Sequence, residues 1–329
     1  MPGENLDFEE PIAVLQKEIG ALRMLPRTSE RQEELERLSR RIDEARRDIF
    51  ANLTPWQHVL VARHPSRPHT LDYIEQLFTE FTEIHGDRRF GDDAAIVTGF
   101  ADLDGEPVVL VGHQKGRGTR ENIRRNFGYA RPEGYRKALR AMKLAEKFRR
   151  PIVVFIDTPA AYPGVESEER GVAEAIAYNL REMTMLTVPI IVLVTGEGGS
   201  GGALGIAIGD TVLMQEYAIY SVIPPEGCAA ILWRDSRKKV EAAEALKIRA
   251  DDLIEMKIID MIISEPLGGA HVDPTGAAEL LKPRLREALK HSAGLSVKER
   301  LELRYQRFRK IGQPGFSEGD SPGPDHVSN

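Results

Sequence analysis

The chain has 329 residues, of which 41% are hydrophobic and 29% charged, and its formal net charge is −6. This is the composition of a soluble globular protein, and the acidic balance argues against nucleic acid or an anionic membrane as the main partner. No stretch approaches the ~20 apolar residues of a membrane span, and the N-terminus lacks an apolar signal segment. The single cysteine, Cys228, excludes an internal disulfide and a cysteine-rich zinc site and suits a cytoplasmic location.

Residues 1–52 are predicted to form a helical hairpin. Apolar residues recur at spacings of three and four, break off at Pro26 and then resume, which is the period of two amphipathic helices. Ser29 and Gln32 have the spacing of a capping box at the second start. The apolar positions are Ile12, Leu15, Ile19, Leu22, Leu35, Leu38, Ile42, Ala45 and Ile49. Each helix has one narrow apolar stripe, so we expect the hairpin to brace the main domain or contact another subunit.

Residues 53–295 alternate between strand and helix patterns. A β-hairpin is predicted around Asp104 and Gly105, because two β-rich runs flank this turn pair. Further helices are expected at 132–148, 168–183 and 201–209, and strands at 151–159, 188–195, 211–223 and 258–266. Apolar strands alternating with helices indicate an α/β domain whose mostly parallel sheet is covered on both faces. We expect a C-terminal helix at 296–312 and a disordered tail at 313–329, which has few large apolar residues.

The densest glycine cluster is TGEGGSGGALGIAIGD, residues 195–210. It contains GxGxxG, the fingerprint of dinucleotide-binding folds. That fingerprint belongs in the first βαβ unit with an acidic residue about 20 residues on. Here the cluster lies past the middle of the chain, Glu216 is the one nearby acid, and the glycines exceed what a pyrophosphate turn needs. These observations argue against a dinucleotide site.

The same cluster contains GxSxG, the nucleophile elbow of α/β-hydrolases. Ser200 would be the nucleophile, and Asp252 or Asp260 followed by His271 has the required order. That order is a weak signal in a chain with 51 acidic residues and eight histidines. We therefore rank a hydrolase below a dinucleotide-binding protein.

A third interpretation uses the main chain of the cluster. A strand is predicted to end at Thr195 and a helix to begin near Ser200, which we expect to cap the helix. N–H groups at a helix start have no partner in the helix and carry partial positive charge, so they suit a transient anion, as in an oxyanion hole. The alternative is that Gly201, Gly202 and Gly205 serve only close helix packing.

A second loop, within FIDTPAAYPGVESEERG (residues 155–171), also follows an apolar strand and precedes a helix. Pro159 and Pro163 stiffen it, and Gly164 is expected to free one backbone turn. Neighbouring parallel strands would present both loops at their carboxyl ends, facing one cleft. Two rigid loops would then direct amides to one point without a charged side chain.

Six segments together carry a family resemblance. They are ARHPSRPHTLDYI, GHQKGRGTRENIRRNFG, PEGYRKALR, DTPAAYPGVESEERG, GEGGSGGALGIAIGD and YSVIPPEGCAAILW. The two loops resemble the crotonase superfamily, and the whole set resembles the alpha subunits of bacterial and plastid acetyl-CoA carboxylase carboxyltransferases, from Leu6 to about Leu295. The family usually has glycine at Ala160, where a positive φ would strain alanine by ~1 kcal/mol. Gly205, where alanine is expected, is a milder departure.

The resemblance implies a crotonase-like (ClpP/crotonase) spiral core of repeated ββα units behind the helical hairpin. It implies an enzyme that transfers the carboxyl group of carboxybiotin, held on a biotin carboxyl carrier protein, to acetyl-CoA, giving malonyl-CoA for fatty acid synthesis. The implied partners are a carboxyltransferase beta subunit, in an α2β2 assembly, the carrier protein and biotin carboxylase. Biotin and acetyl-CoA are expected as cofactor and co-substrate, and no metal is expected on this chain.

The expected oxyanion donors are the amides of Gly201 and Gly202, with the loop from Ala161 to Gly164 opposite them. The residues expected around biotin are Gly198, Gly199, Tyr162, Lys115 and Arg117. The basic segment that contains the last two would attract the substrate carboxylate or the phosphates of coenzyme A. A solvated loop is the alternative for this segment.

Two other functions remain open at this point. A stand-alone acyl-CoA hydratase or isomerase would act without a partner and would need a catalytic carboxylate, for which Glu197 or Glu166 is the available candidate. A non-catalytic scaffold would only organise a carboxylase complex. Near the end of the core, Pro225 is expected to start a helix with Cys228 buried in it as a small apolar residue.

Overall fold

The computed structural model describes residues 6–312, so the tail at 313–329 lies outside the described residues. The strands are β1 (Thr79–Glu83), β2 (Ile96–Leu103), β3 (Glu106–His113), β4 (Ile152–Thr158), β5 (Ile190–Gly199), β6 (Thr211–Gln215), β7 (Ile219–Ser221) and β8 (Met261–Ile263). The first helices are α1 (Glu10–Arg23), α2 (Ser29–Ala51), α3 (Pro55–Ala62), α4 (Thr70–Leu77), α5 (Gly118–Arg124), α6 (Pro132–Lys147) and α7 (Val165–Glu169). The later helices are α8 (Val172–Met185), α9 (Ser200–Leu204), α10 (Pro225–Trp233), α11 (Lys239–Leu246), α12 (Ala250–Glu255), α13 (Pro274–Ala293) and α14 (Val297–Lys310). Short 3-10 helices are η1 (Asp7–Glu9), η2 (Asn126–Gly128) and η3 (Ser236–Lys238).

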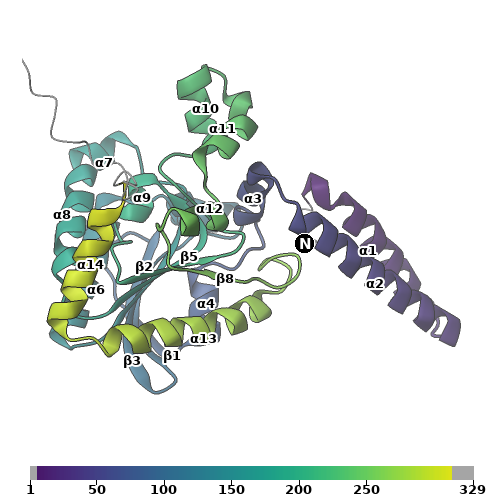
Figure 1. Cartoon of the computed structure of the whole chain (residues 1–329), viewed down its shortest axis with the longest axis horizontal. Coiled ribbons are helices and arrows are strands. Elements are labelled where there is room, and N and C mark those ends of the chain that lie inside the picture. The colour runs from purple at the N-terminus through teal and green to yellow at the C-terminus, as the bar shows by residue number, and fades with distance from the viewer. Residues whose placement is uncertain (1–5, 313–329) are drawn as a thin grey trace, which may run out of the picture.

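The predicted N-terminal hairpin is present as α1 and α2, which extend away from the α/β body (Figure 1). Their facing stripes bury Ile12, Leu15, Ile19, Leu38 and Ile42 against one another. The predicted capping box is wrong. Thr28 caps α2, accepting a hydrogen bond from the Arg31 amide at 3.3 Å, and Ser29 is already the first helical residue.

The eight strands form one sheet, which confirms the predicted α/β class. Its order is β1-β2-β3-β4-β5-β6-β8, with β7 paired to the end of β5. The first three strands are antiparallel, and the predicted hairpin at residues 104–105 joins β2 to β3. From β3 onward every pairing is parallel, so the carboxyl ends of β4 and β5 lie together at one edge.

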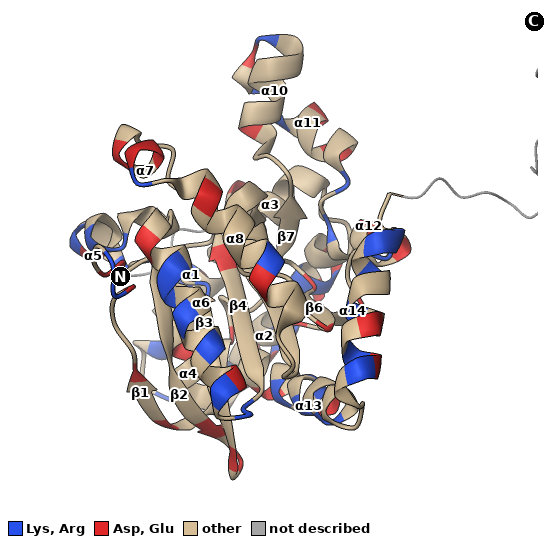
Figure 2. Ribbon diagram, turned by 90° about the vertical axis from the view of Figure 1, so that its left-hand side faces the viewer, with Lys and Arg blue, Asp and Glu red and all other residues tan. Residues whose placement is uncertain are grey.

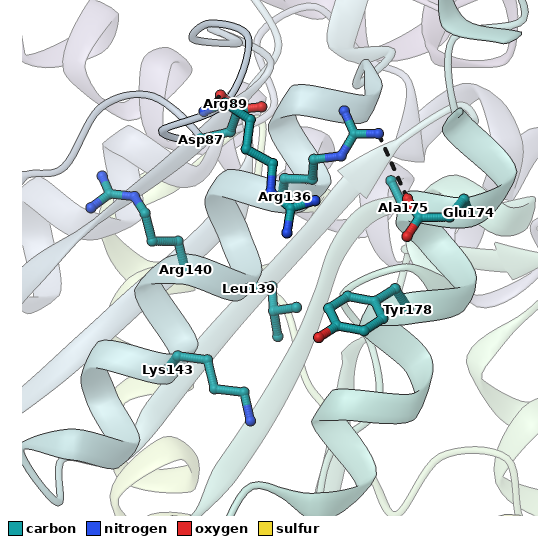
Figure 3. A pocket seen from close by; sticks show the side chains of 9 residues that line it. All are labelled: Asp87, Arg89, Arg136, Leu139, Arg140, Lys143, Glu174, Ala175 and Tyr178. Carbon is teal, nitrogen blue, oxygen red and sulfur yellow. Dashed lines mark hydrogen bonds and ion pairs between the residues drawn. The ribbon is translucent and has the colours of Figure 1, made fainter. Parts of the chain in front are cut away.

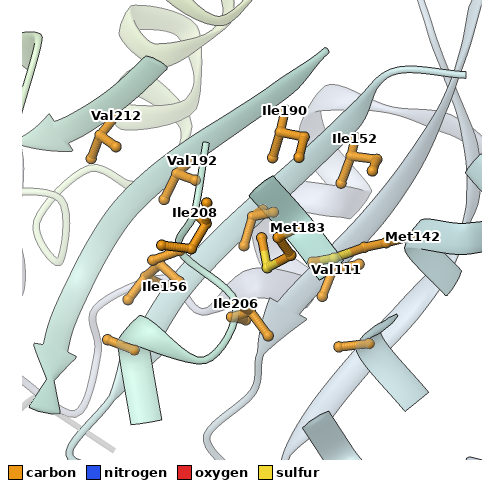
Figure 4. Packing of buried hydrophobic residues seen from close by; sticks show 14 of the residues in the cluster. Val111, Met142, Ile152, Ile156, Met183, Ile190, Val192, Ile206, Ile208 and Val212 are labelled. Carbon is orange, nitrogen blue, oxygen red and sulfur yellow. The ribbon is translucent and has the colours of Figure 1, made fainter. Parts of the chain in front are cut away.

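Both faces of the sheet are covered, because alternate residues of the apolar strands point to opposite sides. Ile156 packs on one side with Met142 of α6 and Met183 of α8 (Figure 4). Phe155 packs on the other side with Leu285 of α13 and with α4. Within residues 6–312, no helix has the length and apolar character needed to cross a bilayer.

Several predicted elements differ in extent from those observed. The strand expected at 211–223 is two strands, β6 and β7, and the strand expected at 258–266 is only the three residues of β8. The strand expected to stop at residue 195 continues to Gly199, because Glu197, Gly198 and Gly199 pair with β7. The helix expected at 201–209 is only α9, five residues long. A five-residue helix has few aligned peptides, so its macrodipole is smaller than the sequence suggested.

The C-terminal helix α14 is attached to the body by a buried arginine. Arg304 is 1% exposed, and its Nε donates to Asp210 Oδ1 at 2.8 Å. Its other nitrogens donate to the carbonyl groups of Met183, Leu186 and Val188. Met183 lies in the last turn of α8, and Leu186 and Val188 follow the helix, so Arg304 donates to main-chain carbonyls around the end of α8.

Replacing Arg304 by Met is expected to lower the free energy of unfolding by about 3–5 kcal/mol, because Asp210 is left as a buried unpaired charge. Urea denaturation followed by circular dichroism measures this. Arg309→Gln, an exposed change on the same helix, is the control and should shift stability by less than about 0.5 kcal/mol. Equal stabilities of the two variants would contradict the role given to Arg304.

Candidate functional site

The two predicted loops meet backbone to backbone at the carboxyl ends of β4 and β5. A Cβ placed on Gly199 would lie 1.8 Å from the Pro159 carbonyl oxygen. A Cβ placed on Gly202 would lie 2.4 Å from the carbonyl carbon of Ala160 and 2.5 Å from the nitrogen of Ala161. Real Cβ atoms do not approach backbone this closely, so the contact requires glycine at both positions. Close packing therefore accounts for both glycines, and the alternative interpretation anticipated this for Gly202 but not for Gly199.

Gly201 differs from its neighbours, because a Cβ there would meet only Ile176 Cδ1, at 3.7 Å. Packing gives no reason for this glycine. The amides of Gly201 and Gly202 lie in the first turn of α9, where the helix offers no acceptor. Among the described residues none accepts a hydrogen bond from either amide, or from the Ala161 amide in the facing loop. Three main-chain donors at this junction are thus unpaired within residues 6–312.

Ser200 occupies the junction with φ +51°, the left-handed region that is strained for a serine. The expected cap is wrong, since the Ser200 side chain makes no capping hydrogen bond to α9. The expected strain at Ala160 is also wrong, because Ala160 is not among the described residues with positive φ. Alanine therefore fits this position without a conformational cost.

Gly164 and Tyr162 form the wall of the second loop. A Cβ on Gly164 would lie 2.3 Å from the Tyr162 ring, so glycine here lets the ring pack on the backbone. The expectation that Gly164 frees a turn is wrong, because its φ is −72° and it precedes α7 in extended conformation. The Tyr162 amide donates to the carbonyl of Ala130 at 2.9 Å. The Tyr162 N–H is thus already paired, and the Arg131 guanidinium lies over the Tyr162 ring, 5.1 Å from its centroid.

A network of charged side chains lies at the same strand ends. Lys115 Nζ is 2.7 Å from Asp157 Oδ1 and 2.7 Å from Glu197 Oε2. Arg63 Nε is 2.6 Å from Glu197 Oε1, and His69 Nδ1 is 3.2 Å from Asp157 Oδ2. The Glu197 amide also donates to Asp157 Oδ1 at 3.0 Å. The network thus joins the ends of β3, β4 and β5 to the segment before α4.

The opposite charges in this network determine the protonation states of its acidic and basic groups. Burial alone would raise the pKa of Glu197, but Lys115 and Arg63 outweigh it and hold that pKa below its usual value. Burial likewise opposes charge on Asp157, and Lys115 and His69 lower the pKa of Asp157 well below the ordinary range. The pKa of Lys115 is raised because its two carboxylate partners outweigh its burial. All three groups are therefore ionised at neutral pH.

These pairings change the expected role of the basic segment. Lys115 does not present an unpaired charge to a substrate, because two carboxylates neutralise it. Arg117 forms a two-pronged ion pair with Asp72, at 2.7 and 2.8 Å, although its side chain is 49% exposed. Both side chains line a pocket of about 400 Å³ between residues 62–69 and 115–122. The solvated-loop alternative is wrong for Lys115, which is largely buried.

The hydrolase interpretation is wrong, since its proposed partners of Ser200 are engaged elsewhere. Asp260 pairs with Arg307, and Asp252 pairs with Arg249. His271 faces Glu9 of η1, with Nε2 3.6 Å from Oε1. The expected helix at Pro225 is present as α10, with Cys228 buried.

Sequence reasoning missed three members of the charged network: Arg63, His69 and Asp157. Asp157 carried a signal, because it is the one acidic residue in an otherwise apolar, fully buried strand. Arg63 and His69 lie in ARHPSRPH, which was quoted for its resemblance but not for chemistry. Their partners are 134 and 88 residues away, so spacing alone could not reveal the contacts.

The chain is similar in sequence to proteins of one known family. The family described as acetyl co-enzyme A carboxylase carboxyltransferase-like matches residues 5–312. A Geobacter metallireducens protein named acetyl-coenzyme A carboxylase carboxyl transferase subunit alpha is 58% identical over 310 residues, 94% of this chain and 98% of its own length. The protein of that name from Actinobacillus pleuropneumoniae serotype 5b is 54% identical over 315 residues, covering 95% and 99%.

Among solved structures, transcarboxylase 12S has a TM-score of 0.56 at 21% identity over 68% of this chain and 41% of its own. A Pseudomonas malonate decarboxylase hetero-tetramer in complex with coenzyme A has a TM-score of 0.55 at 18% identity, covering 67% and 89%. At these identities the likeness shows the fold. It confirms the crotonase-like core and excludes the dinucleotide-binding fold suggested by GxGxxG.

Replacing Glu197 by Gln should lower the free energy of unfolding by about 1–3 kcal/mol, because it removes the charge that two partly or fully buried cations contact. Thermal and urea unfolding at pH 7 measure the loss. Glu226→Gln is the matched control, since Glu226 also pairs with Arg63 at 2.6 Å but is 38% exposed. The free energy of unfolding of Glu226→Gln should fall by less than about 1 kcal/mol. A larger loss of unfolding free energy for Glu226→Gln than for Glu197→Gln would contradict the greater contribution assigned to Glu197.

Proposed function

Because the chain belongs to the acetyl-CoA carboxylase carboxyltransferase family as an alpha subunit, we propose that its two loops form the biotin-side oxyanion hole of this transferase. The enzyme transfers a carboxyl group to acetyl-CoA, giving malonyl-CoA for fatty acid biosynthesis. Carboxybiotin, delivered on a carrier protein, supplies that carboxyl group. The observation that supports the site is the set of unpaired amides where the loop after β4 touches the start of α9.

The proposed donors are the amides of Gly201, Gly202 and Ala161. Release of a carboxyl group leaves negative charge on the ureido oxygen of biotin, and fixed N–H groups stabilise charge as it develops. One well-placed donor is worth ~3–4 kcal/mol of barrier. The Tyr162 ring and Gly164 would form the wall of the pocket. Gly198 and Gly199 act mainly through packing, against Tyr220 and Pro159 respectively.

Neutral amides, rather than a cationic side chain, carry the stabilisation in this proposal. The charged network beneath the loops contains two permanent cations, Arg63 and Lys115, against the carboxylates of Asp157, Glu197 and Glu226. It therefore has no surplus positive charge to offer a substrate. We assign these side chains a positioning role, because they hold the strand ends from which both loops begin.

Glu197 does not suit the general acid of a stand-alone hydratase. Two cations contact its carboxylate and hold its pKa below the usual value, so it carries no proton to donate at neutral pH. This removes Glu197 from the two carboxylates that the hydratase alternative offered; the other, Glu166, lies in α7.

We propose that a beta subunit binds acetyl-CoA and completes the site, in an α2β2 assembly that works in the cytoplasm with the carrier protein and biotin carboxylase. An exposed apolar surface supports a partner chain. Val222, Ile231 and Leu232 are 76%, 70% and 66% exposed around the lobe of α10 and α11, which projects from the body (Figure 1). Several large apolar side chains exposed on one projecting lobe are typical of protein interfaces.

The experiment that tests the function is biotin-dependent decarboxylation of malonyl-CoA by the full chain, with and without the beta subunit. Activity is expected only with the partner. Activity of this chain alone would favour a stand-alone crotonase-type enzyme. A correctly assembled complex that decarboxylates no malonyl-CoA would favour a non-catalytic scaffold.

In the same assay, Gly202→Ala should reduce kcat by about 10²–10³-fold, because its Cβ forces the two loops apart and displaces the donors. Gly201→Ala is the matched control. Its Cβ meets only an ordinary 3.7 Å contact and its N–H is retained, so kcat should change little. Comparable losses in both variants would show that the loop contact is not what positions the donors.

A further inference from the structure

We propose that a basic pocket between α6 and α8 binds the diphosphate of a nucleotide. The pocket has a volume of about 290 Å³, near the lower end for ligand sites. Basic residues recur along α6 on the side toward the viewer in Figure 2. Four basic side chains line the pocket against two acidic ones, Asp87 and Glu174, although the whole chain has a net charge of −6. The basic ones are Arg89, Arg136, Arg140 and Lys143.

Two arginines keep unused donor capacity at this pocket. Arg89 is exposed, and no described residue pairs with its guanidinium. Arg136 donates from Nη2 to the Arg170 carbonyl at 2.5 Å, and the same nitrogen lies 3.7 Å from Glu174 Oε2, yet its buried Nε has no hydrogen-bond partner. An unpaired buried donor is costly unless a ligand satisfies it. Figure 3 shows these two side chains approaching each other at one end of the pocket.

The loop that carries Arg89 is held in place by Asp87. Asp87 Oδ1 accepts hydrogen bonds from the amides of Arg89, Phe90 and Gly91 at 2.8, 2.8 and 3.0 Å. Arg140 anchors the same loop through Nε and Nη2, which donate to the carbonyls of residues 86 and 85. Burial lowers the pKa of Arg140 and Arg88 adds to the effect, while Asp87 and Asp92 oppose it. The backbone that carries Arg89 is therefore fixed by hydrogen bonds within the protein.

An aromatic side chain extends the recognition beyond phosphate. Tyr178 is 41% exposed, and its ring faces the pocket beside Leu139 (Figure 3). Arginines in pairs suit the oxygens of a diphosphate, and an exposed tyrosine ring offers a base a stacking surface. Together they favour a nucleotide. Lys143 contributes less, because Glu182 pairs with it at 3.0 Å.

This pocket is separate from the proposed oxyanion hole. It shares no lining residue with the pocket that contains Lys115 and Arg117. The nucleotide could be free in solution or could be the nucleotide end of a coenzyme A molecule. Both carry an adenosine diphosphate group, so the chemistry of recognition is the same.

Isothermal titration of the full chain with ADP, inorganic diphosphate and coenzyme A tests the proposal. ADP is expected to bind at one site with Kd below about 1 mM, more tightly than inorganic diphosphate. Arg89→Gln should weaken ADP binding by about tenfold or more, since it removes a charged partner of the phosphates. The control is Arg309→Gln, the same chemical change at an exposed position on α14, which should bind as wild type.

The outcomes distinguish a free nucleotide from the nucleotide end of coenzyme A as the ligand. Coenzyme A that binds more tightly than ADP and is displaced by it identifies the nucleotide end of coenzyme A, whereas ADP that binds more tightly than coenzyme A identifies a free nucleotide. Absence of ADP binding, or equal affinities of Arg89→Gln and Arg309→Gln, would overturn the site. Equal affinities for ADP and inorganic diphosphate would overturn its assignment to a nucleotide. None of these measurements depends on carboxyl transfer, so they leave the proposed function untouched.

Discussion

The contact between the backbones of Gly202 and Ala160 to Ala161 is the constraint on which the rest of the site depends. It brings two loops from neighbouring parallel strands within van der Waals distance, and only residues without a side chain allow it. A sheet of parallel strands makes such a meeting possible, because it places successive strand ends at one edge. Helices cover both faces of the sheet, so its strands are buried and composed mostly of apolar residues.

The charged network holds in place the strand ends from which the two contacting loops begin. Asp157 and Glu197 project from adjacent strands, and Lys115 lies between them, so the ends of β3, β4 and β5 are tied together one step before the loops begin. Burying these charges costs free energy, which the short ion pairs offset only when all members are present. The arrangement therefore favours one geometry of the strand ends rather than adding greatly to overall stability.

Much of this architecture is visible in the sequence, and the failures have physical causes. Local patterns identified α1, α2 and most strands of the sheet, because burial imposes a period on each element; the exposed strand β1 was missed, and β6 and β7 were predicted as one strand. The predicted cap of α2 was one residue too late, because Thr28 and Ser29 are chemically alike and only the backbone conformation decides which of them caps the helix. The end of β5 was missed because it depends on pairing with β7, about twenty residues later. Lys115 appeared as a free cation because its acidic partners lie 42 and 82 residues away in the chain. The unpaired amides of Gly201 and Gly202, by contrast, follow from the start of a helix after an apolar strand, which the sequence indicates directly.

The bond from Arg304 to Asp210 also has a consequence for how the molecule is made. The two residues are 94 positions apart, so Asp210 leaves the ribosome long before the arginine that neutralises it. At ~5–20 residues per second the interval is roughly 5–20 s. During that time Asp210 has no cationic partner from α14. The part of the core at the end of α8 is therefore completed only when α14, the last described helix, has been synthesised.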